Sequence, residues 1–396
     1  MRGFLLAISL LTAFVGRSQD TAVPAEPRAR LLTKFHFRQL TGGVILVQGR
    51  FNDVSTPLNF ILDSGSGAIS LDSATTEEFH IPHFPSGKSI NGIAGIEYVD
   101  HVPNSTLRFP GLEMDSLDFY INNYDLLSAV YGVKIDGIMG YSFLNRYIVK
   151  VDFDSLDIEV FTPGAFNYPR NGYTLHPLFT ALPIQSLTIR DARNVTANFY
   201  LDTGAGLCFL MSKQFEDDSL VLLKKRKPVS IQVQGLGGRK DMRLTIMKEV
   251  QLGPYRFHKV PTDILDDIYN ATSYPFLGGL VGDDILRRFN IVFNYEKKEI
   301  HLTPNSHFRD PFDYSYTGLN MYYDSGQIKL DEVIPRSPAY RAGLKRDDVI
   351  VAVNSNFSND IETYKELMQN VGDKITMVIT RKSVPMILVF RVGRIF

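Results

Sequence analysis

The chain has 396 residues, of which 44% are hydrophobic, and this is enough to bury the cores of two or three domains. Its 42 basic and 43 acidic residues give a formal net charge of −1, which excludes an overall electrostatic attraction to nucleic acid or to an anionic membrane. The single cysteine, Cys208, excludes an internal disulfide and a site of several thiolates. We therefore expect a globular protein held together by packing, with no nucleic-acid partner.

The first residues predict export. Arg2 precedes a stretch of about 13 mostly apolar residues, 3–15, which ends in small and polar residues. This stretch is shorter than the roughly 20 residues needed to span a bilayer, so a signal peptide is favoured over a membrane anchor. We expect residues 1–19 to be removed near Ser18 or Gln19, and the protein to be periplasmic or extracellular without a membrane span.

A short strand that runs into an acidic turn organises the first half. After a polar leader at residues 20–31, predicted to be flexible, β-rich patterns lead to Asn59-Phe-Ile-Leu-Asp63-Ser-Gly-Ser66. A glycine-rich segment at 89–98 suits the tip of a hairpin, and an apolar pair stands between the glycines of 137–140. Two strand patterns within 148–161 close this half.

The second half repeats this order. The same stretch returns as Asn198-Phe-Tyr-Leu-Asp202-Thr-Gly-Ala205, a glycine-rich turn at 234–239 replaces the hairpin tip, and 279–282 again places an apolar pair between glycines. In each half the glycine pair follows its aspartate by about 75 residues, and residues 286–304 echo the closing strands of the first half. The pattern indicates an internal duplication of a unit the size of a small domain.

The last part of the chain changes character. A polar, proline-containing segment at 306–315 is predicted to be a linker. From 316 to 396, strand patterns alternate with two short helical patterns, at 337–344 and 361–370. We expect a separate, smaller domain there.

Two aspartates in matching turns point to an acid–base pair. Carboxyl groups about 3 Å apart cannot both ionise comfortably, so they share one proton; the ionised member can activate water while the protonated member bonds a carbonyl group. The hydroxyls of Ser64 and Thr203 can tie the two turns together. Gly65 and Gly204 let backbone N–H groups approach the carboxylates. A single turn of this kind is typical of an ordinary loop, but two copies in a duplicated chain favour a shared site.

These motifs resemble those of the retropepsin and pepsin superfamily of aspartic proteases over residues 32–305. The resemblance implies a mainly β, bilobal double β-barrel, with lobe 1 at 32–165 and lobe 2 at 166–305. It also implies a peptide or protein substrate and no cofactor. By the same resemblance, Asp63 and Asp202 would be the catalytic dyad.

The resemblance implies further roles around the dyad. The residues that would support the two carboxyl groups are Ser64, Gly65, Ser66, Thr203, Gly204 and Ala205. The loops beneath the dyad would contain Gly137, Gly140, Gly279 and Gly282. The candidate flap residues are Gly92, Gly95, Tyr98, Gly235 and Gly237. Ser66 matches the pepsin-like pattern and Ala205 the retropepsin pattern, and we interpret Tyr98 as structural rather than as a flap tyrosine.

The segment 316–396 resembles a PDZ domain, a partly open β-barrel with helices. Its carboxylate loop would be Gly318, Leu319, Asn320 and Met321. In that family the backbone N–H groups of this loop bind a peptide C-terminus, and the peptide adds as a strand beside a helix. Asn320 stands where the family often has glycine, so a domain that packs on the protease lobes without binding peptide stays open as an alternative.

Other patterns carry less weight. His80 and His83 lack the third ligand of a zinc site, so no metal is predicted. The turn at 235–238 superficially suggests a phosphate-binding loop, but no helical pattern follows it. The basic run at 224–227 is typical of a solvated loop.

The sequence therefore predicts an exported, monomeric aspartic endopeptidase that uses an Asp63/Asp202 dyad, with a PDZ-like domain for peptide or partner binding. Two alternatives stay open. The lobes could be catalytically silent while the PDZ-like domain binds peptides, or each half could pair with its counterpart in another chain.

Overall fold

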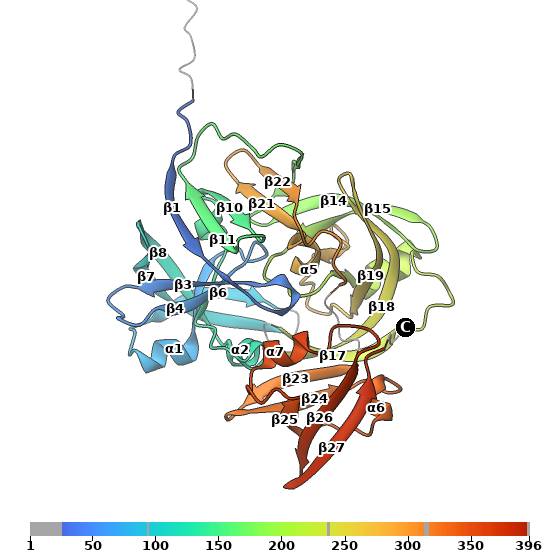
Figure 1. The fold of residues 1–396 in the computed structure, drawn as a ribbon. Helices are drawn as coiled ribbons and strands as arrows, with labels where there is room; N and C mark the ends of the chain where they lie inside the picture. The colour runs from blue at the N-terminus through green and yellow to red at the C-terminus, as the bar shows by residue number, and fades with distance from the viewer. Residues whose placement is uncertain (1–25, 93–94, 236–237, 313–316, 394–396) are drawn as a thin grey trace, which may run out of the picture.

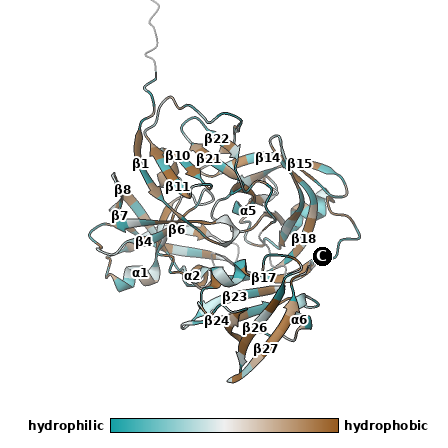
Figure 2. Ribbon diagram, viewed as in Figure 1, coloured by the Kyte–Doolittle hydropathy of each residue, from teal (hydrophilic) through white to brown (hydrophobic). Residues whose placement is uncertain are grey.

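The computed structural model describes residues 26–92, 95–235, 238–312 and 317–393. In this part of the chain two β-rich lobes share a sheet between them, and a smaller β-domain packs against both (Figure 1). The predicted mainly β fold class is confirmed, and the strands of both lobes carry hydrophobic as well as hydrophilic residues (Figure 2). The predicted signal peptide lies outside the described residues.

Lobe 1 is built on a sheet with the strand order β2-β3-β4-β9-β5-β8-β7-β6. Its strands are β2 (Arg38–Gln39), β3 (Ile45–Phe51), β4 (Leu58–Leu62), β5 (Ile69–Asp72), β6 (Phe84–Asn91), β7 (Ile96–Phe109), β8 (Leu112–Asn122) and β9 (Gly137–Met139). Its helical segments are η1 (Thr41–Gly43), α1 (Ser73–Glu78), α2 (Asp125–Tyr131) and α3 (Tyr141–Leu144). Strand β9 pairs parallel to β4 and antiparallel to β5, so it lies directly beside the strand that ends at the first aspartate.

Lobe 2 has the corresponding order β13-β14-β15-β20-β16-β19-β18-β17. Its strands are β13 (Leu178–Phe179), β14 (Pro183–Arg190), β15 (Asn194–Leu201), β16 (Phe209–Ser212), β17 (Val229–Gly235), β18 (Gly238–Leu252), β19 (Tyr255–Leu265) and β20 (Gly279–Val281). Its helices are α4 (Lys213–Ser219) and α5 (Asp283–Leu286). Strand β20 pairs parallel to β15 and antiparallel to β16, which repeats the arrangement of lobe 1.

A third sheet joins the lobes, with the order β1-β11-β10-β21-β22-β12. Its strands are β1 (Leu31–His36), β10 (Ile148–Asp152), β11 (Asp157–Phe161), β12 (Tyr173–Leu175), β21 (Phe289–Asn294) and β22 (Glu299–Pro304). The closing strands of the two halves meet where β10 runs antiparallel to β21, with Val149 opposite Phe293. Because both side chains are buried in one core that includes residues of both lobes, the lobes cannot separate without exposing it.

The described parts of the predicted flexible leader and of the predicted linker are packed on the rest of the chain. In the leader, the N–H of Ala29 donates to the carbonyl oxygen of Ala165 at 3.0 Å. In the predicted linker, the buried Arg288 side chain donates to the carbonyl oxygens of Asp310, at 2.6 Å, and of Pro311, at 3.0 Å. The described part of the linker therefore belongs to the surface of lobe 2, because a buried guanidinium needs these acceptors.

The C-terminal domain has its own core and a sheet with the order β23-β24-β25-β26-β27. Its strands are β23 (Leu319–Asp324), β24 (Gln327–Val333), β25 (Val349–Val353), β26 (Lys374–Arg381) and β27 (Val384–Arg391). Its helices are α6 (Pro338–Arg341) and α7 (Ile361–Glu366), which begin at the side-chain caps Ser337 and Asp360. The domain packs on lobe 1 through α7 and on lobe 2 beside β17.

Candidate active site

Asp63 and Asp202 occupy matching positions, each directly after a strand whose last residue, Leu62 or Leu201, is buried. β4 runs into Asp63, whose backbone N–H donates to the carbonyl oxygen of Met139 at 3.0 Å. β15 runs into Asp202, whose N–H donates to the carbonyl oxygen of Val281, also at 3.0 Å. Each aspartate is thus held by the neighbouring strand, β9 or β20, and keeps part of its surface in contact with solvent.

The two carboxyl groups lie against each other across the junction of the lobes, and a side-chain hydrogen bond joins them. A Cβ atom added to Gly65 would lie 2.3 Å from Cγ of Asp202, and one added to Gly204 would lie 2.3 Å from Cγ of Asp63. Glycine is therefore required at both positions, since any side chain would displace the carboxyl group of the opposite lobe. The structure brings the two predicted residues into one site.

Reciprocal hydrogen bonds tie the two aspartate turns together. The Ser64 hydroxyl donates to the carbonyl oxygen of Leu201 at 2.9 Å and accepts the N–H of Thr203 at 3.1 Å. The Thr203 hydroxyl donates to the carbonyl oxygen of Leu62 at 2.9 Å and accepts the N–H of Ser64 at 3.0 Å. Both hydroxyls are buried, so each of these polar groups depends on the other lobe for its partner.

The predicted glycine loops pass close beneath the turns. A Cβ atom added to Gly137 would lie 2.3 Å from the carbonyl oxygen of Ser70. One added to Gly140 would lie 2.3 Å from the carbonyl oxygen of Ser66. In lobe 2 the corresponding approaches are 2.0 Å at Gly279 and 2.1 Å at Gly282. These distances leave no room for a side chain, which explains why both halves repeat the glycine spacing.

The environment of the two carboxyl groups raises both pKa values. Burial, followed by the negative charge of Asp202, raises the pKa of Asp63 well above its ordinary value. Burial also raises the pKa of Asp202, although hydrogen bonds from Asp63 and from backbone N–H groups oppose the shift. The pair therefore holds a shared proton to higher pH than an isolated aspartate would.

The two turns differ in how they hold their carboxyl groups. Oδ1 of Asp202 accepts the N–H groups of Gly204, at 2.9 Å, and Ala205, at 3.0 Å. Oδ1 of Asp63 accepts the N–H of Gly65 at 2.7 Å. The Ser66 hydroxyl donates to the carbonyl oxygen of Ala68 at 3.2 Å, away from the carboxyl pair. The N–H of Gly204 also faces Asp63, so the backbone offers two donors to each carboxyl group, and the side-chain hydrogen bond from Asp63 is what favours the ionised form of Asp202.

A third carboxyl group, Asp283, lies near the dyad and was missed by sequence reasoning. It follows Gly282 at the start of α5, is fully buried, and neither of its carboxyl oxygens has a hydrogen-bond partner among the described residues. Burial raises the pKa of Asp283 well above its ordinary value; the positive charge of Arg287 opposes this shift, and the charges of Asp202 and Asp63 add to it. The signal was the Gly-Asp pair, where the first half has Gly140 followed by Tyr141.

The predicted flap glycines belong to two long hairpins. In lobe 1, β6 and β7 form a hairpin whose end is closed by a hydrogen bond of 2.8 Å from the N–H of Gly92 to the carbonyl oxygen of Gly95. Tyr98 is 88% exposed, so it neither covers the dyad nor packs as a structural residue in this conformation. In lobe 2, β17 and β18 pair up to Gly235, and Gly237 lies outside the described residues.

The predicted carboxylate loop leads into the edge strand of the C-terminal domain. Gly318 precedes β23, and its carbonyl oxygen accepts the N–H of Ile334 at 2.8 Å. Leu319 and Met321 point into the domain core, whereas the Asn320 side chain contacts lobe 2. In the described ranges no three His, Cys, Asp or Glu side chains gather in a metal-binding cluster, and no helix there is long and apolar enough to cross a membrane.

Replacing Thr203 with valine tests the link between the lobes. The change keeps the shape but removes a donor to Leu62 and an acceptor for Ser64, so we expect the free energy of unfolding to fall by about 2–4 kcal/mol. Urea unfolding monitored by circular dichroism measures it. Thr203→Ser, which keeps the hydroxyl, should lower the free energy of unfolding clearly less. Equal decreases in the two variants would show that the hydroxyl does not stabilise the contact between the lobes.

Replacing Asp283 with asparagine tests the buried carboxyl. Because its native pKa is raised, the folded chain keeps a proton that the unfolded chain loses, so wild-type stability falls as pH rises above the ordinary aspartate pKa. Relative to Asp283→Asn, the free energy of unfolding of the wild type should fall by up to about 1.4 kcal/mol per pH unit between pH 4 and the pKa of Asp283 in the folded protein. Urea unfolding of both proteins at pH 4, 5, 6 and 7 measures this. A difference that stays constant with pH would contradict the assignment.

Comparisons with known proteins agree with this geometry. The family model described as aspartyl protease matches twice, at residues 47–143 and 186–285, and a PDZ domain model matches residues 330–381. The chain is also 38% identical over 69 residues to the periplasmic pH-dependent serine endoprotease DegQ of Escherichia coli (strain K12). That match covers 17% of this chain and 15% of DegQ.

The two aspartyl protease matches contain Asp63 and Asp202 in corresponding places, and the PDZ match falls within the C-terminal domain. The match to DegQ is short, so it gives no reason to look for serine-protease chemistry here. The chain consists of two retropepsin-like aspartyl protease units in tandem, followed by a PDZ domain.

Proposed function

We propose that the protein is an aspartic endopeptidase that hydrolyses peptide bonds at the junction of its two lobes. The observation that carries the proposal is the pair formed by Asp63 and Asp202, whose carboxyl groups are hydrogen-bonded to each other and face the glycine of the opposite turn. Two carboxyl groups in this position hold one proton between them over a wide pH range. Such a pair supplies an acid and a base at the same place.

In the proposed reaction, the ionised Asp202 takes a proton from a water molecule whose oxygen attacks the carbonyl carbon of the peptide. Asp63 donates its proton to the carbonyl oxygen, which gives a tetrahedral diol. A proton from the dyad then reaches the amide nitrogen as the carbon–nitrogen bond breaks, and the second diol proton returns to the dyad. The products are a carboxylic acid and an amine, and the dyad again holds one proton. The route needs no covalent bond between the substrate and the protein.

The roles of acid and base follow from the donors around each group. Asp202 receives two N–H groups of its own turn and the hydrogen bond from Asp63, and these favour its charged form. Asp63 accepts the N–H of Gly65 at 2.7 Å and also faces the N–H of Gly204, but its burial and the charge of Asp202 outweigh these donors and favour its protonated form. We therefore assign the shared proton to Asp63 in the free enzyme.

Asp63→Asn and Asp202→Asn should each abolish cleavage, with a loss of at least about a thousandfold, because neither variant can hold one proton between two carboxyl groups. The measurement is hydrolysis of denatured casein and of a quenched-fluorescence peptide library from pH 3 to pH 7.5. Asp373→Asn, on an exposed turn of the PDZ domain, is the matched control and should keep full activity.

Retained cleavage in either dyad variant would overturn the proposal. The rival function is a peptide-binding protein whose protease lobes do not turn over, and the PDZ match is the observation in its favour. It predicts no wild-type cleavage at any pH together with measurable peptide binding.

We also propose that the protein is exported as a monomer. The support is the apolar stretch near the N-terminus, and a complete dyad within one chain. Mass spectrometry of the protein purified from its host should find a new N-terminus near Gln19, and light scattering of the active protein should give the mass of one chain. An intact N-terminus in the secreted fraction, or a dimer that alone is active, would contradict these statements.

A further inference from the structure

The PDZ domain forms hydrogen bonds with backbone groups on the edge strand of lobe 2. β17 ends the sheet of that lobe, and the backbone of Gln232 faces outward from it. The N–H of Gln232 donates to Oε2 of Glu332 at 3.0 Å, and its carbonyl oxygen accepts Nδ2 of Asn320 at 3.3 Å. Nδ2 of Asn320 also donates to Glu332 at 3.1 Å. Two side chains of the PDZ domain thus replace the neighbouring strand that β17 lacks.

Apolar and charged contacts extend this attachment along the hairpin of β17 and β18. Ile334 of the PDZ domain is buried in a cluster with lobe 2 residues that include Ile231 of β17 and Met242 of β18. Arg239, next to the end of the hairpin, forms an ion pair of 3.1 Å with Asp331. The PDZ domain therefore holds the hairpin at its base and near its end.

The same domain is fastened to lobe 1 through α7. Oε2 of Glu362 accepts the N–H of Thr41 at 2.5 Å and also its hydroxyl. Nζ of Lys365 donates to the carbonyl oxygen of Val130 at 3.2 Å, and Ile361 packs on the end of α2 at Gly132. Helix α2 in turn packs against both β23 and β17.

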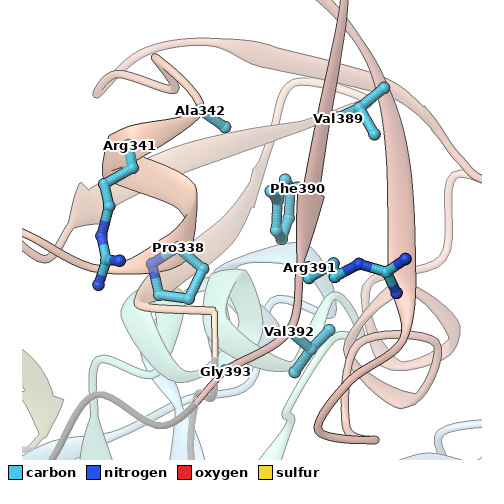
Figure 3. A pocket seen from close by; sticks show the side chains of 8 residues that line it. All are labelled: Pro338, Arg341, Ala342, Val389, Phe390, Arg391, Val392 and Gly393. Carbon is cyan, nitrogen blue, oxygen red and sulfur yellow. The ribbon is translucent and has the colours of Figure 1, made fainter.

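These contacts lie where a PDZ domain takes its peptide. A peptide adds as a strand to an exposed sheet edge, and β23 is the edge strand of this sheet, with α7 packed on it. Helix α2, α7 and β17 gather over β23 (Figure 1). A cavity of about 470 Å³ lies instead between α6 and β27, at the opposite edge of the sheet (Figure 3), and Pro338 and Phe390 are among the residues that line it.

We propose that the PDZ domain uses its peptide-binding side to hold the chain's own protease lobes, and so fixes the β17–β18 hairpin. A peptide with a free C-terminal carboxylate would have to displace the lobes to reach β23. The hairpin of lobe 1 has no such attachment among the described residues, so the two duplicated hairpins differ in mobility. The effect on cleavage rests on the proposed function, whereas the docking itself does not.

Hydrogen–deuterium exchange on the full chain tests the attachment. In the double variant Asn320→Ala with Glu332→Ala, amides throughout 229–252, including those bonded between β17 and β18, should exchange at least about tenfold faster. Amides of β6 and β7 should not change. Asp373→Ala, which removes an exposed carboxylate elsewhere on the domain, is the matched control. Unchanged exchange in 229–252 would overturn the proposal.

Peptide binding tests the competition. The probe is a pool of fluorescein-labelled hexapeptides with apolar C-terminal residues and free carboxylates, and the readout is fluorescence anisotropy. The double variant Asn320→Ala with Glu332→Ala, combined with Glu362→Ala and Lys365→Ala, should bind the pool at least tenfold more tightly than the wild type. Amidation of the C-termini of the peptides should abolish this binding. Equal binding by wild type and variant, or none by either, would contradict the competition.

Cleavage kinetics separate this proposal from the function on which it partly rests. The Asn320→Ala, Glu332→Ala variant should show a several-fold higher KM with kcat within about twofold of the wild type, because a looser hairpin binds substrate less well but leaves the dyad intact. The exchange experiment repeated in the Asp63→Asn background should give the same result as in the wild type. The proposed docking of the PDZ domain therefore stands even if the protein proves to have no protease activity.

Discussion

The buried hydrogen bonds between the Ser64 and Thr203 turns are the constraint on which the rest of this structure depends. Each hydroxyl finds both its donor and its acceptor partner in the opposite lobe, so neither turn is complete alone. The same bonds bring each glycine against the opposite carboxyl group, which places the two aspartates in contact. The raised pKa values of the pair follow from that contact and from burial. Stability and chemistry therefore have a common origin here.

Much of this arrangement could be predicted from the sequence because the duplication places the same motifs at the same spacing in both halves of the chain. The paired aspartates and the glycines beneath them have fixed spacing, and the reason for each glycine is steric. The burial of Asp283 could not be predicted, since a Gly-Asp pair looks the same at a surface turn. Nor could the packing of the supposed linker, which depends on Arg288 reaching backbone carbonyls some twenty residues further along the chain. Contacts between distant segments, such as Gln232 with Glu332, leave no local pattern.

The two halves share a plan but not the same surroundings. Both carry a long hairpin, yet β17 is bonded to the PDZ domain, whereas β6 ends its sheet without a strand beside it in the described residues. The turns differ as well, because Ala205 lends its N–H to Asp202 while Ser66 turns its hydroxyl away from Asp63. A duplicated ancestor with two equal halves would leave the proton equally on either carboxyl. In the proposed mechanism Asp202 is the base, and in the proposed docking the hairpin of lobe 2 is the more rigid one.

The central claim is that each chain contains one dyad that holds one proton and binds one tetrahedral intermediate. Titration of the purified protein with a statine-containing peptide, which mimics that intermediate, tests it most directly by isothermal calorimetry at acidic pH. The account predicts one inhibitor bound per chain, uptake of protons when the binding pH approaches neutrality, and loss of binding in Asp63→Asn. No binding, or one inhibitor for every two chains, would contradict it.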